Sequence, residues 1–370
     1  MTPLEYTPPL ERFSKQEFDL KQSYKDLDNL TPVMFAARYG LNNKLCELLK
    51  PLDDSERDQI LSAKNQGGLT PLHFAARYGQ IETTRLLLKY GASPLIASNL
   101  AQLPIHSAFN ENNSIDTIRT IVQCLMGDKD SISICNQEGD TVAHFAAAFD
   151  LTDILKQLHE MDVNLLNKTN NRQSPPLFIA ILSNKLDAIE YLLTVTDLTL
   201  TDSRGRNALH YAAIYGTDEV LQKIIPYFSV NSIDGEHCTA LYFIIKDQQI
   251  SKMKTLLNAG AQLNIESSMQ LPLHTAVLSL NRDLVDLILE YNGDINVTNS
   301  EGITPLFMLF LKGKNINSQP LINMVLYLLS KDADLDVPSH KEGTLRDYVR
   351  GINLPESIKH LNSNSPSNSR

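Results

Sequence analysis

The sequence predicts an all-α solenoid, in which short helix–turn–helix units stack side by side along the chain. Three observations support this prediction: a six-residue motif recurs through the 370 residues, a leucine-rich segment follows the clearest copies, and an Asn/Asp-x-x-Gly turn precedes several of them. The two most similar copies span residues 30–40 and 69–79 and share the ending Phe-Ala-Ala-Arg-Tyr-Gly. Because one such unit cannot bury its apolar faces alone, we expect its stability to come from stacking on neighbours.

Each segment of the repeat has a predicted structural role. The motif begins at residues 31, 70, 103, 141, 175, 207, 239, 271, 304 and 343, at intervals of 32 to 39 residues. In the second copy, Thr70 can cap the first helix with its hydroxyl, and Pro71 suits the first helical position. The three leucines at 86–88 supply the apolar face of the second helix, and Gly91 ends it in a left-handed conformation. The Asn/Asp-x-x-Gly segments then form tight turns at the tips of protruding fingers.

This pattern resembles the ankyrin repeat, which reads Thr-Pro-Leu-His-x-Ala with a period near 33 residues. The resemblance covers about residues 30 to 360 and implies an ankyrin-repeat solenoid with short β-turn fingers. We expect three regions: an N-terminal capping helix region at 1–29, an array of nine repeats plus a degenerate capping repeat at 30–361, and a disordered polar tail at 362–370. The amphipathic helix predicted within the first region could instead bind a partner.

Histidine occupies the fourth motif position in half of the repeats, namely at His73, His106, His144, His210 and His274. The resemblance implies that each imidazole hydrogen-bonds to its own turn and to the adjacent backbone. A metal site would need several of them to converge, whereas successive repeats place them roughly 10 Å apart in a row. We therefore predict no metal site and no cofactor. The other repeats are expected to be held by packing at Met34, Phe178, Tyr242 and Phe307.

Few residues offer chemistry of their own. His159-Glu160 begins like a zinc-protease motif, but Val163 stands where the second histidine ligand belongs. Asp234, His237 and Cys238 are the residue types of a thiol nucleophile site, yet they fall where a finger tip is expected. No segment leaves the repeat register for the roughly 100 residues of a typical catalytic domain. The sequence therefore predicts a protein that is not an enzyme.

Aromatic residues near the ends of the first helices are candidates for partner binding. In ankyrin arrays these helix ends and the fingers line a concave recognition surface. Aromatic side chains and arginine are enriched at binding hot spots, and four of the first six repeats carry an aromatic residue at this point. The alternative is that the rings only cover the helix ends. With two apolar finger residues included, the predicted partner-binding residues are Arg38, Tyr39, Arg77, Tyr78, Leu95, Ile96, Phe149 and Tyr215.

Two long intervals contain insertions. The first, at 51–64, is acidic and is expected between a second helix and the next finger. The second, at 313–320, is expected to lengthen the connection between the two helices of its repeat. We expect both to be solvated loops, although insertions in solenoids can also form binding edges.

The composition restricts the partners and the compartment. The 33 basic and 43 acidic residues give a net charge of −10, which argues against nucleic acid or an anionic membrane surface as the partner. The four cysteines include no Cys-x-x-Cys pair, and no apolar run approaches the roughly 18 residues of a membrane helix. The first residues also lack the pattern of a secretory signal. We therefore expect a cytoplasmic protein without membrane insertion. Capped arrays of this kind are usually monomeric, so we also expect a monomer.

The predicted function is that of a non-enzymatic scaffold or adaptor, which binds a partner protein through the concave face and the fingers. One alternative is an ankyrin-type effector that an intracellular bacterium delivers into host cells, where it would act in the host cytosol. A further alternative is a divergent enzyme hidden in the terminal regions. The sequence identifies neither the partner nor the pathway.

Overall fold

The chain divides into two compact units between Asn171 and Arg172. The computed structural model describes residues 30–127, 132–266, 271–312, 318–350, 352 and 354–362. The predicted capping helix region at 1–29 lies outside the described residues, as does the predicted tail apart from residue 362. The described residues contain helices and two isolated β-bridges but no extended strand, so the predicted all-α class is confirmed.

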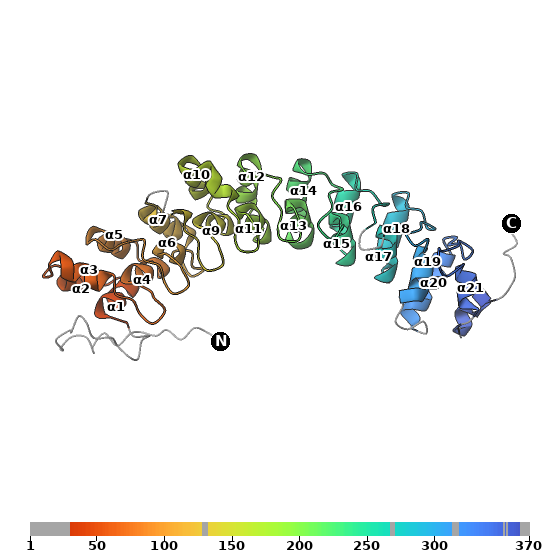
Figure 1. Cartoon of the computed structure of the whole chain (residues 1–370), viewed down its shortest axis with the longest axis horizontal. Helices are drawn as coiled ribbons and strands as arrows, with labels where there is room; N and C mark the ends of the chain where they lie inside the picture. Colours follow the sequence, from red (N-terminus) through yellow and green to blue (C-terminus); the bar gives the residue numbers. More distant parts are fainter. Residues whose placement is uncertain are drawn as a thin grey trace. The chain divides into compact units, whose positions relative to one another are not determined.

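The helices of the first unit form two rows (Figure 1). The inner row consists of α1 (Pro32–Arg38), α4 (Pro71–Arg77), α6 (Pro104–Ser107) and α9 (Val142–Ala148). The outer row consists of α2 (Asn42–Leu49), α5 (Ile81–Lys89), α7 (Ile115–Leu125) and α10 (Thr152–Met161), with η2 (Val163–Asn167) after α10. Each inner helix packs on the next inner helix and on its own outer partner, as expected for stacked helix pairs.

The second unit repeats this two-row arrangement (Figure 1). Its inner row consists of α11 (Pro176–Leu182), α13 (Ala208–Tyr215), α15 (Ala240–Lys246), α17 (Pro272–Leu278) and α19 (Pro305–Lys312). The outer helices are α12 (Leu186–Val195), α14 (Asp218–Ile224), α16 (Ile250–Asn258), α18 (Arg282–Glu290) and α20 (Gln319–Leu329), with η3 (Ile225–Tyr227) after α14. The closing pair is α21 (Leu345–Val349) and η4 (Glu356–Asn362).

The start of an inner helix is held differently in repeats with and without the histidine. In the second repeat the Thr70 hydroxyl lies 2.8 Å from Nδ1 of His73, and this Nδ1 also accepts the Thr70 N–H at 3.1 Å. Where the histidine is absent, a threonine hydroxyl accepts the backbone N–H three residues on, at 3.2 to 3.3 Å; these pairs are Thr31–Met34, Thr239–Tyr242 and Thr304–Phe307. The expectation that packing alone holds these three repeats is therefore wrong, because a hydroxyl cap supplies the missing hydrogen bond.

The buried face of α5 differs from the predicted run of leucines. Thr83, Thr84 and Leu87 are buried, whereas Leu86 and Leu88 are only partly covered. An α-helix has 3.6 residues per turn, so three consecutive leucines cannot share one face. Gly91 follows with φ +94°, the left-handed conformation expected at the end of this helix.

The fingers pair with one another through their tips. In the first unit the N–H groups of Asn99, Gln137 and Asn171 each donate to a carbonyl of the preceding finger at 3.0 Å. The tip turn contains a left-handed residue, which is glycine at Gly68, Gly139, Gly205 and Gly302 with φ between +73° and +83°. In three other fingers the residue is Ala101, Gln173 or His237, with a smaller φ of +55° to +58°. Glycine thus permits a more open left-handed turn than these side chains adopt.

The insertion at 51–64 forms a helix and not the expected loop. Asp53 caps α3 (Asp54–Leu61), because its carboxylate accepts the Glu56 N–H at 2.8 Å and Glu56 accepts the Asp53 N–H at 3.2 Å. Ile60 and Leu61 at the end of this helix are buried. This reciprocal capping box and the apolar anchor explain why the acidic segment is helical.

The insertion at 313–320 separates the two helices of its repeat, as predicted. Helix α19 ends at Lys312 and α20 begins at Gln319. Residues 313–317 between them lie outside the described residues.

The last repeat begins one residue later than its sequence alignment indicates. The hydroxyl of Thr344 accepts the Asp347 N–H at 3.1 Å and starts α21, whereas Gly343 lies in the preceding turn with φ +72°. The motif start at 343 is therefore wrong by one position, because the capping hydroxyl defines the start of the helix. Leu345 and Val349 of this helix are buried.

Thr217 provides a direct test of helix capping in the array. Its hydroxyl accepts the Val220 N–H at 3.3 Å at the start of α14. Thr217→Ala should lower the free energy of unfolding by about 1 kcal/mol, because this N–H loses its acceptor. Thr217→Ser keeps the acceptor and is the matched control. Urea unfolding followed by circular dichroism measures both variants, and an alanine variant as stable as the parent would contradict the cap.

Candidate partner-binding surface

His73 links two neighbouring repeats of the first unit. Its Nδ1 accepts the Thr70 N–H at 3.1 Å, and its Nε2 lies 2.9 Å from the Gln102 carbonyl of the next repeat. Because Nδ1 acts as an acceptor, we infer that Nε2 carries the proton and donates it to that carbonyl. The side chain is fully buried, so this contact belongs to the interior of the array.

Two histidines of the second unit make the same contact across repeats. Nε2 of His210 lies 3.0 Å from the Cys238 carbonyl, and Nε2 of His274 lies 2.8 Å from the Ile303 carbonyl. In both cases the acceptor immediately precedes the next motif copy. The imidazole therefore fixes the distance between one inner helix and the following finger.

The remaining two motif histidines also accept N–H groups of their own turns. His106 and His144 accept the N–H groups of Leu103 and Thr141, each at 3.1 Å. Nε2 of His106 is buried and has no hydrogen-bond partner among the described residues.

Burial keeps these imidazoles neutral. It lowers the pKa of His73 and that of His106 to about 4, and it also lowers the pKa of His210 and that of His274. A charged imidazole in these positions would lose its hydration, and at His210 and His274 this cost outweighs the attraction of the nearby Asp234 and Glu266. Within the described residues, no group of three or more His, Cys, Asp or Glu side chains is placed to hold a metal ion.

Asp234, His237 and Cys238 build one finger turn. Oδ1 of Asp234 accepts the N–H groups of Glu236 and Cys238 at 2.9 and 2.8 Å. His237 is exposed, whereas the Cys238 side chain is only 1% exposed. Oδ2 of Asp234 lies 3.5 Å from the buried Nε of Arg206. These groups shape the turn, and a thiol shielded from solvent is poorly placed to attack a substrate.

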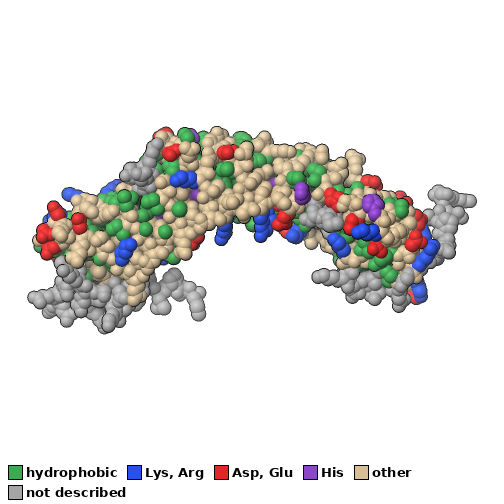
Figure 2. Space-filling view, viewed as in Figure 1, with side chains coloured by type: hydrophobic (Ala, Val, Ile, Leu, Met, Phe, Trp, Pro, Cys, Tyr) green, Lys and Arg blue, Asp and Glu red, His purple; other side chains and the backbone are tan. Residues whose placement is uncertain are grey.

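A row of arginine and aromatic side chains lies at and just beyond the C-terminal ends of the inner helices of the first unit. We call it the aromatic–arginine strip, and it consists of Arg38, Tyr39, Arg77, Tyr78, Phe109 and Phe149. Figure 2 shows hydrophobic side chains gathered over the region of α4 and α6. The packing of α1 on α4, of α4 on α6 and of α6 on α9 arranges the strip in this order.

The Arg38 guanidinium joins the first two repeats of the strip. Its central carbon lies 4.6 Å from the ring centroid of Tyr78 and 5.5 Å from that of Tyr39. The rings are anchored one helical turn earlier, because Tyr39 packs on Phe35 and Tyr78 on Phe74, with centroids 4.6 and 6.4 Å apart. Tyr78 is 39% exposed.

Side chains from the next repeat hold the backbone beneath the arginines. The Gln80 side-chain amide donates to the Arg38 carbonyl at 3.3 Å, and the Asn113 amide donates to the Arg77 carbonyl at 3.3 Å. These bonds satisfy carbonyls that a helix end leaves unpaired. The strip therefore stands on a fixed backbone, as a binding surface requires.

The second half of the strip is an aromatic cluster. The ring centroid of Phe109 lies 5.7 Å from that of Phe149 and 5.3 Å from that of Phe145. The sequence analysis identified Phe149 but missed Phe109 and Phe145. The spacing of Phe145 and Phe149, four residues apart on one helix, would have indicated the cluster. Phe109 follows a four-residue helix, so its position departs from the regular repeat.

The predicted finger contacts Leu95 and Ile96 lie in the turn after α5 and not at the finger tip. Leu95 is 48% exposed and Ile96 is partly buried. The tip is formed by Asn99 and Leu100, and Leu100 is 52% exposed. The sequence analysis missed Leu100, although an apolar residue in a tip turn is unusual.

Tyr215 is the predicted binding residue of the second unit. It is 47% exposed and packs on Tyr211, with ring centroids 5.5 Å apart. It borders an open hollow of about 470 Å³ that Asp218 and Lys252 also line. Nζ of Lys252 donates to the Ala213 carbonyl at 3.2 Å, and burial lowers its pKa. This lysine caps the end of α13, so the positive charge that lines the hollow has a structural role.

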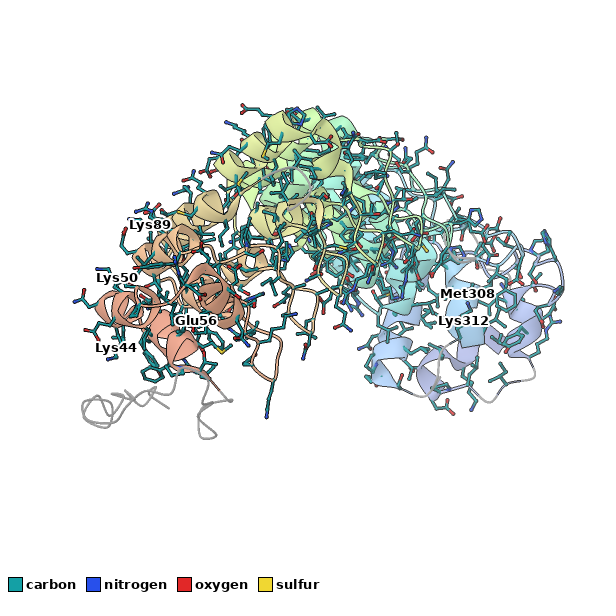
Figure 3. All side chains as sticks on the ribbon, turned by 60° about the vertical axis from the view of Figure 1, so that its left-hand side comes forward. Lys44, Lys50, Glu56, Lys89, Met308 and Lys312 are labelled. Carbon is teal, nitrogen blue, oxygen red and sulfur yellow. The ribbon has the colours of Figure 1, made fainter. Side chains whose placement is uncertain are left out.

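The ninth repeat carries different residues at the strip positions. Met308 and Lys312 of α19 occupy the places that Phe74 and Tyr78 hold in the second repeat (Figure 3). Met308 is 1% exposed, whereas Lys312 is exposed. The aromatic pair is thus a feature of particular repeats and not of the motif itself.

A model of three consecutive ankyrin repeats matches residues 10–98, 105–202 and 194–267, which is more than half of the chain. The protein therefore belongs to the ankyrin-repeat family. Repeats of this kind form protein–protein interaction modules. Among the described residues, no helix is both long and apolar enough to cross a membrane.

Curated relatives share parts of the array. The nuclear factor NF-kappa-B p105 subunit of Gallus gallus is 28% identical over 187 residues, which cover 47% of this chain and 19% of the relative. The putative ankyrin repeat protein L371 of Acanthamoeba polyphaga mimivirus is 24% identical over 62% of this chain and 31% of its own length. The putative ankyrin repeat protein FPV024 of fowlpox virus is 34% identical over a segment that covers 36% of this chain and 23% of the relative. The chain thus spans less than a third of the length of each of these relatives.

Proposed function

We propose that this protein is a non-enzymatic adaptor that captures a partner protein on the aromatic–arginine strip. The observation that carries the proposal is the combination of an exposed Tyr78 with the Arg38 guanidinium stacked on its ring, 4.6 Å from the centroid. Arginine and aromatic side chains dominate binding energy at interfaces, because they bury large areas at fixed geometry. The cluster of Phe109 and Phe149 extends this apolar surface along two further repeats.

The strip supports the binding of a protein, but nothing in its residues indicates delivery from a bacterium into a host cell. We therefore propose the adaptor and not the delivered effector. Three properties stay predictions from the sequence: that the protein has no enzymatic activity, that it lies in the cytoplasm and that it is a monomer. A catalytic segment in the terminal regions is not part of the proposal. Leu95, Ile96 and Tyr215 are proposed as secondary contacts, because Leu95 and Tyr215 are about half exposed.

The double variant Tyr78→Ala/Phe149→Ala is expected to reduce partner capture at least tenfold, which corresponds to about 1.4 kcal/mol. Both side chains lie at the surface end of their helices, so the melting temperature should change little. Affinity capture from lysate, followed by quantitative mass spectrometry, measures the loss.

The matched control is Val163→Ala/Tyr227→Ala, which removes two apolar side chains that are 57% and 47% exposed outside the strip. This control should capture the same proteins as the parent. Equal capture by the strip variant and the control would remove the proposal.

A further inference from the structure

The two arginines of the strip lack the carboxylate partner that many other arginines of this chain have. Ion pairs within the described residues engage Arg57, Arg85, Arg119, Arg206, Arg346 and Arg350. No described carboxylate lies within ion-pair distance of Arg38 or Arg77. These two side chains occupy the same register on α1 and α4, which pack directly on each other. The strip therefore holds two neighbouring positive charges without a described counterion.

The contacts of Arg38 leave its hydrogen-bond donors free for an anion. Tyr39 and Tyr78 cover faces of the guanidinium, while its buried Nε has no hydrogen-bond partner among the described residues. Stacking on rings orients a guanidinium but does not use its N–H groups, which bind a carboxylate in a two-pronged geometry. Because Nε is buried, an incoming carboxylate would pair with the terminal N–H groups of Arg38, which are not buried, in a charge-assisted interaction.

Charge changes along the strip. Arg38 and Arg77 lie at its first end, whereas the exposed Glu111 and the residue Asp150 follow the phenylalanines at its second end. Phe109 and Phe149 pack against each other with tilted rings, whose centroids lie 5.7 Å apart, and form an apolar surface. A ligand that is anionic at one end and apolar at the other complements this order.

We propose that the strip binds an acidic peptide segment, whose carboxylates pair with Arg38 and Arg77 and whose apolar side chain packs on Phe109 and Phe149. This inference rests on the proposed function and adds the chemistry of the partner. Neighbouring inner helices are roughly 10 Å apart, so the two carboxylates are separated by about three residues of extended chain. The whole strip then accommodates about ten residues. Nucleic acid fits less well, because only two cations are present and the net charge of the chain is −10.

The test is a selection of random twelve-residue peptides, displayed on phage, against the full chain. Enriched peptides should carry two acidic residues about three positions apart, followed by an aromatic or large aliphatic residue. Their dissociation constants, measured by fluorescence anisotropy on synthetic peptides, should rise at least tenfold in Arg38→Gln/Arg77→Gln. They should also rise with salt, because the carboxylate pairs are partly exposed.

The charge-matched control is Lys50→Gln/Lys89→Gln, which removes two positive charges near the ends of the outer helices α2 and α5 (Figure 3). Its peptide affinity should stay within about twofold of the parent. If Arg38→Gln lowers the melting temperature, the exposed Arg77→Gln alone provides the test and should weaken binding at least threefold.

The outcomes separate the two proposals. Selected peptides without acidic residues, or acidic peptides that bind Arg38→Gln/Arg77→Gln unchanged but are lost in Tyr78→Ala/Phe149→Ala, would overturn the acidic chemistry and leave the proposed function standing. Peptides that respond to neither variant, or no enrichment at all, would overturn both. Tighter binding of a twelve-nucleotide RNA than of any acidic peptide would also overturn the inference.

Discussion

Lowering the pH from 7.5 to 5 is expected to destabilise the array by about 4 kcal/mol through two histidines alone. Burial lowers the pKa of His73 and that of His106 to about 4 from the ordinary value of 6.5. The unfolded chain therefore binds more protons than the folded chain between pH 6.5 and pH 4. This part of the stability is complete above pH 6.5 and is lost as the pH falls, by about 2 kcal/mol per histidine at pH 5.

Other titratable groups contribute in the same direction as these histidines or only below pH 4. Burial also lowers the pKa of His210 and that of His274, so both add to the loss in the second unit. Hydrogen bonds from Thr199 and Arg346 lower the pKa of Asp197 and that of Asp336, whose ordinary value is 3.8, so their contributions are lost only at still lower pH. The change in the free energy of unfolding between pH 6.5 and pH 5 therefore reports on the buried histidines.

Urea unfolding of the parent and of His73→Gln/His106→Gln at pH 7.5, 6.5, 5.5 and 5.0 measures this effect. The double variant should be less stable at pH 7.5, because it loses the contact to Gln102, but its stability should depend much less on pH. His340→Gln replaces an exposed histidine and should keep the slope of the parent. A parent whose free energy of unfolding is flat between pH 7.5 and 5 would contradict the buried, neutral state of these imidazoles.

The sequence predicted the order of helices well, because the repeat motif encodes its own helix start. Thr70 precedes a helix that begins at Pro71, as predicted, and Gly91 ends the next one in the left-handed region. The expectation that packing alone holds the repeat of Met34 was wrong, because a threonine hydroxyl can act in two ways. The hydroxyl of Thr70 contacts the imidazole, whereas that of Thr31 caps the helix backbone. Only the residue three positions on decides between these roles.

The strip was only partly predictable, because it depends on contacts between repeats. Position in the motif identified Arg38 and Tyr78 separately, but their stacking across two helices follows from the packing of α1 on α4. Phe109 was missed because α6 is short and shifts the chain out of the regular pattern. The acidic insertion was expected to be a loop, because its capping box with Asp53 and Glu56 lies outside the repeat motif.

Replacing Gly68 by alanine is expected to lower the free energy of unfolding by about 3 kcal/mol. This loss is larger than the strain of placing alanine in the left-handed conformation. Gly68 adopts φ +76°, and an added Cβ would lie 2.5 Å from the backbone nitrogen of Asn99 in the next finger. That nitrogen donates to the Gly67 carbonyl at 3.0 Å, and the Asn99 amide donates to the Gln66 carbonyl at 2.8 Å. The side chain would force these bonds apart, at about 1 kcal/mol each, in addition to about 1 kcal/mol for the left-handed conformation.

Gly91→Ala is the matched control within the same repeat, because it separates strain from the clash. Gly91 has a similar φ of +94°, but its added Cβ would meet only one side-chain atom, at 3.9 Å. This variant should lose about 1 kcal/mol. Ala101 shows that alanine can occupy a finger turn, but at the smaller φ of +55°. Urea unfolding of both variants measures the difference, and equal losses would mean that the fingers move apart freely and that their tip-to-tip hydrogen bonds contribute little to stacking.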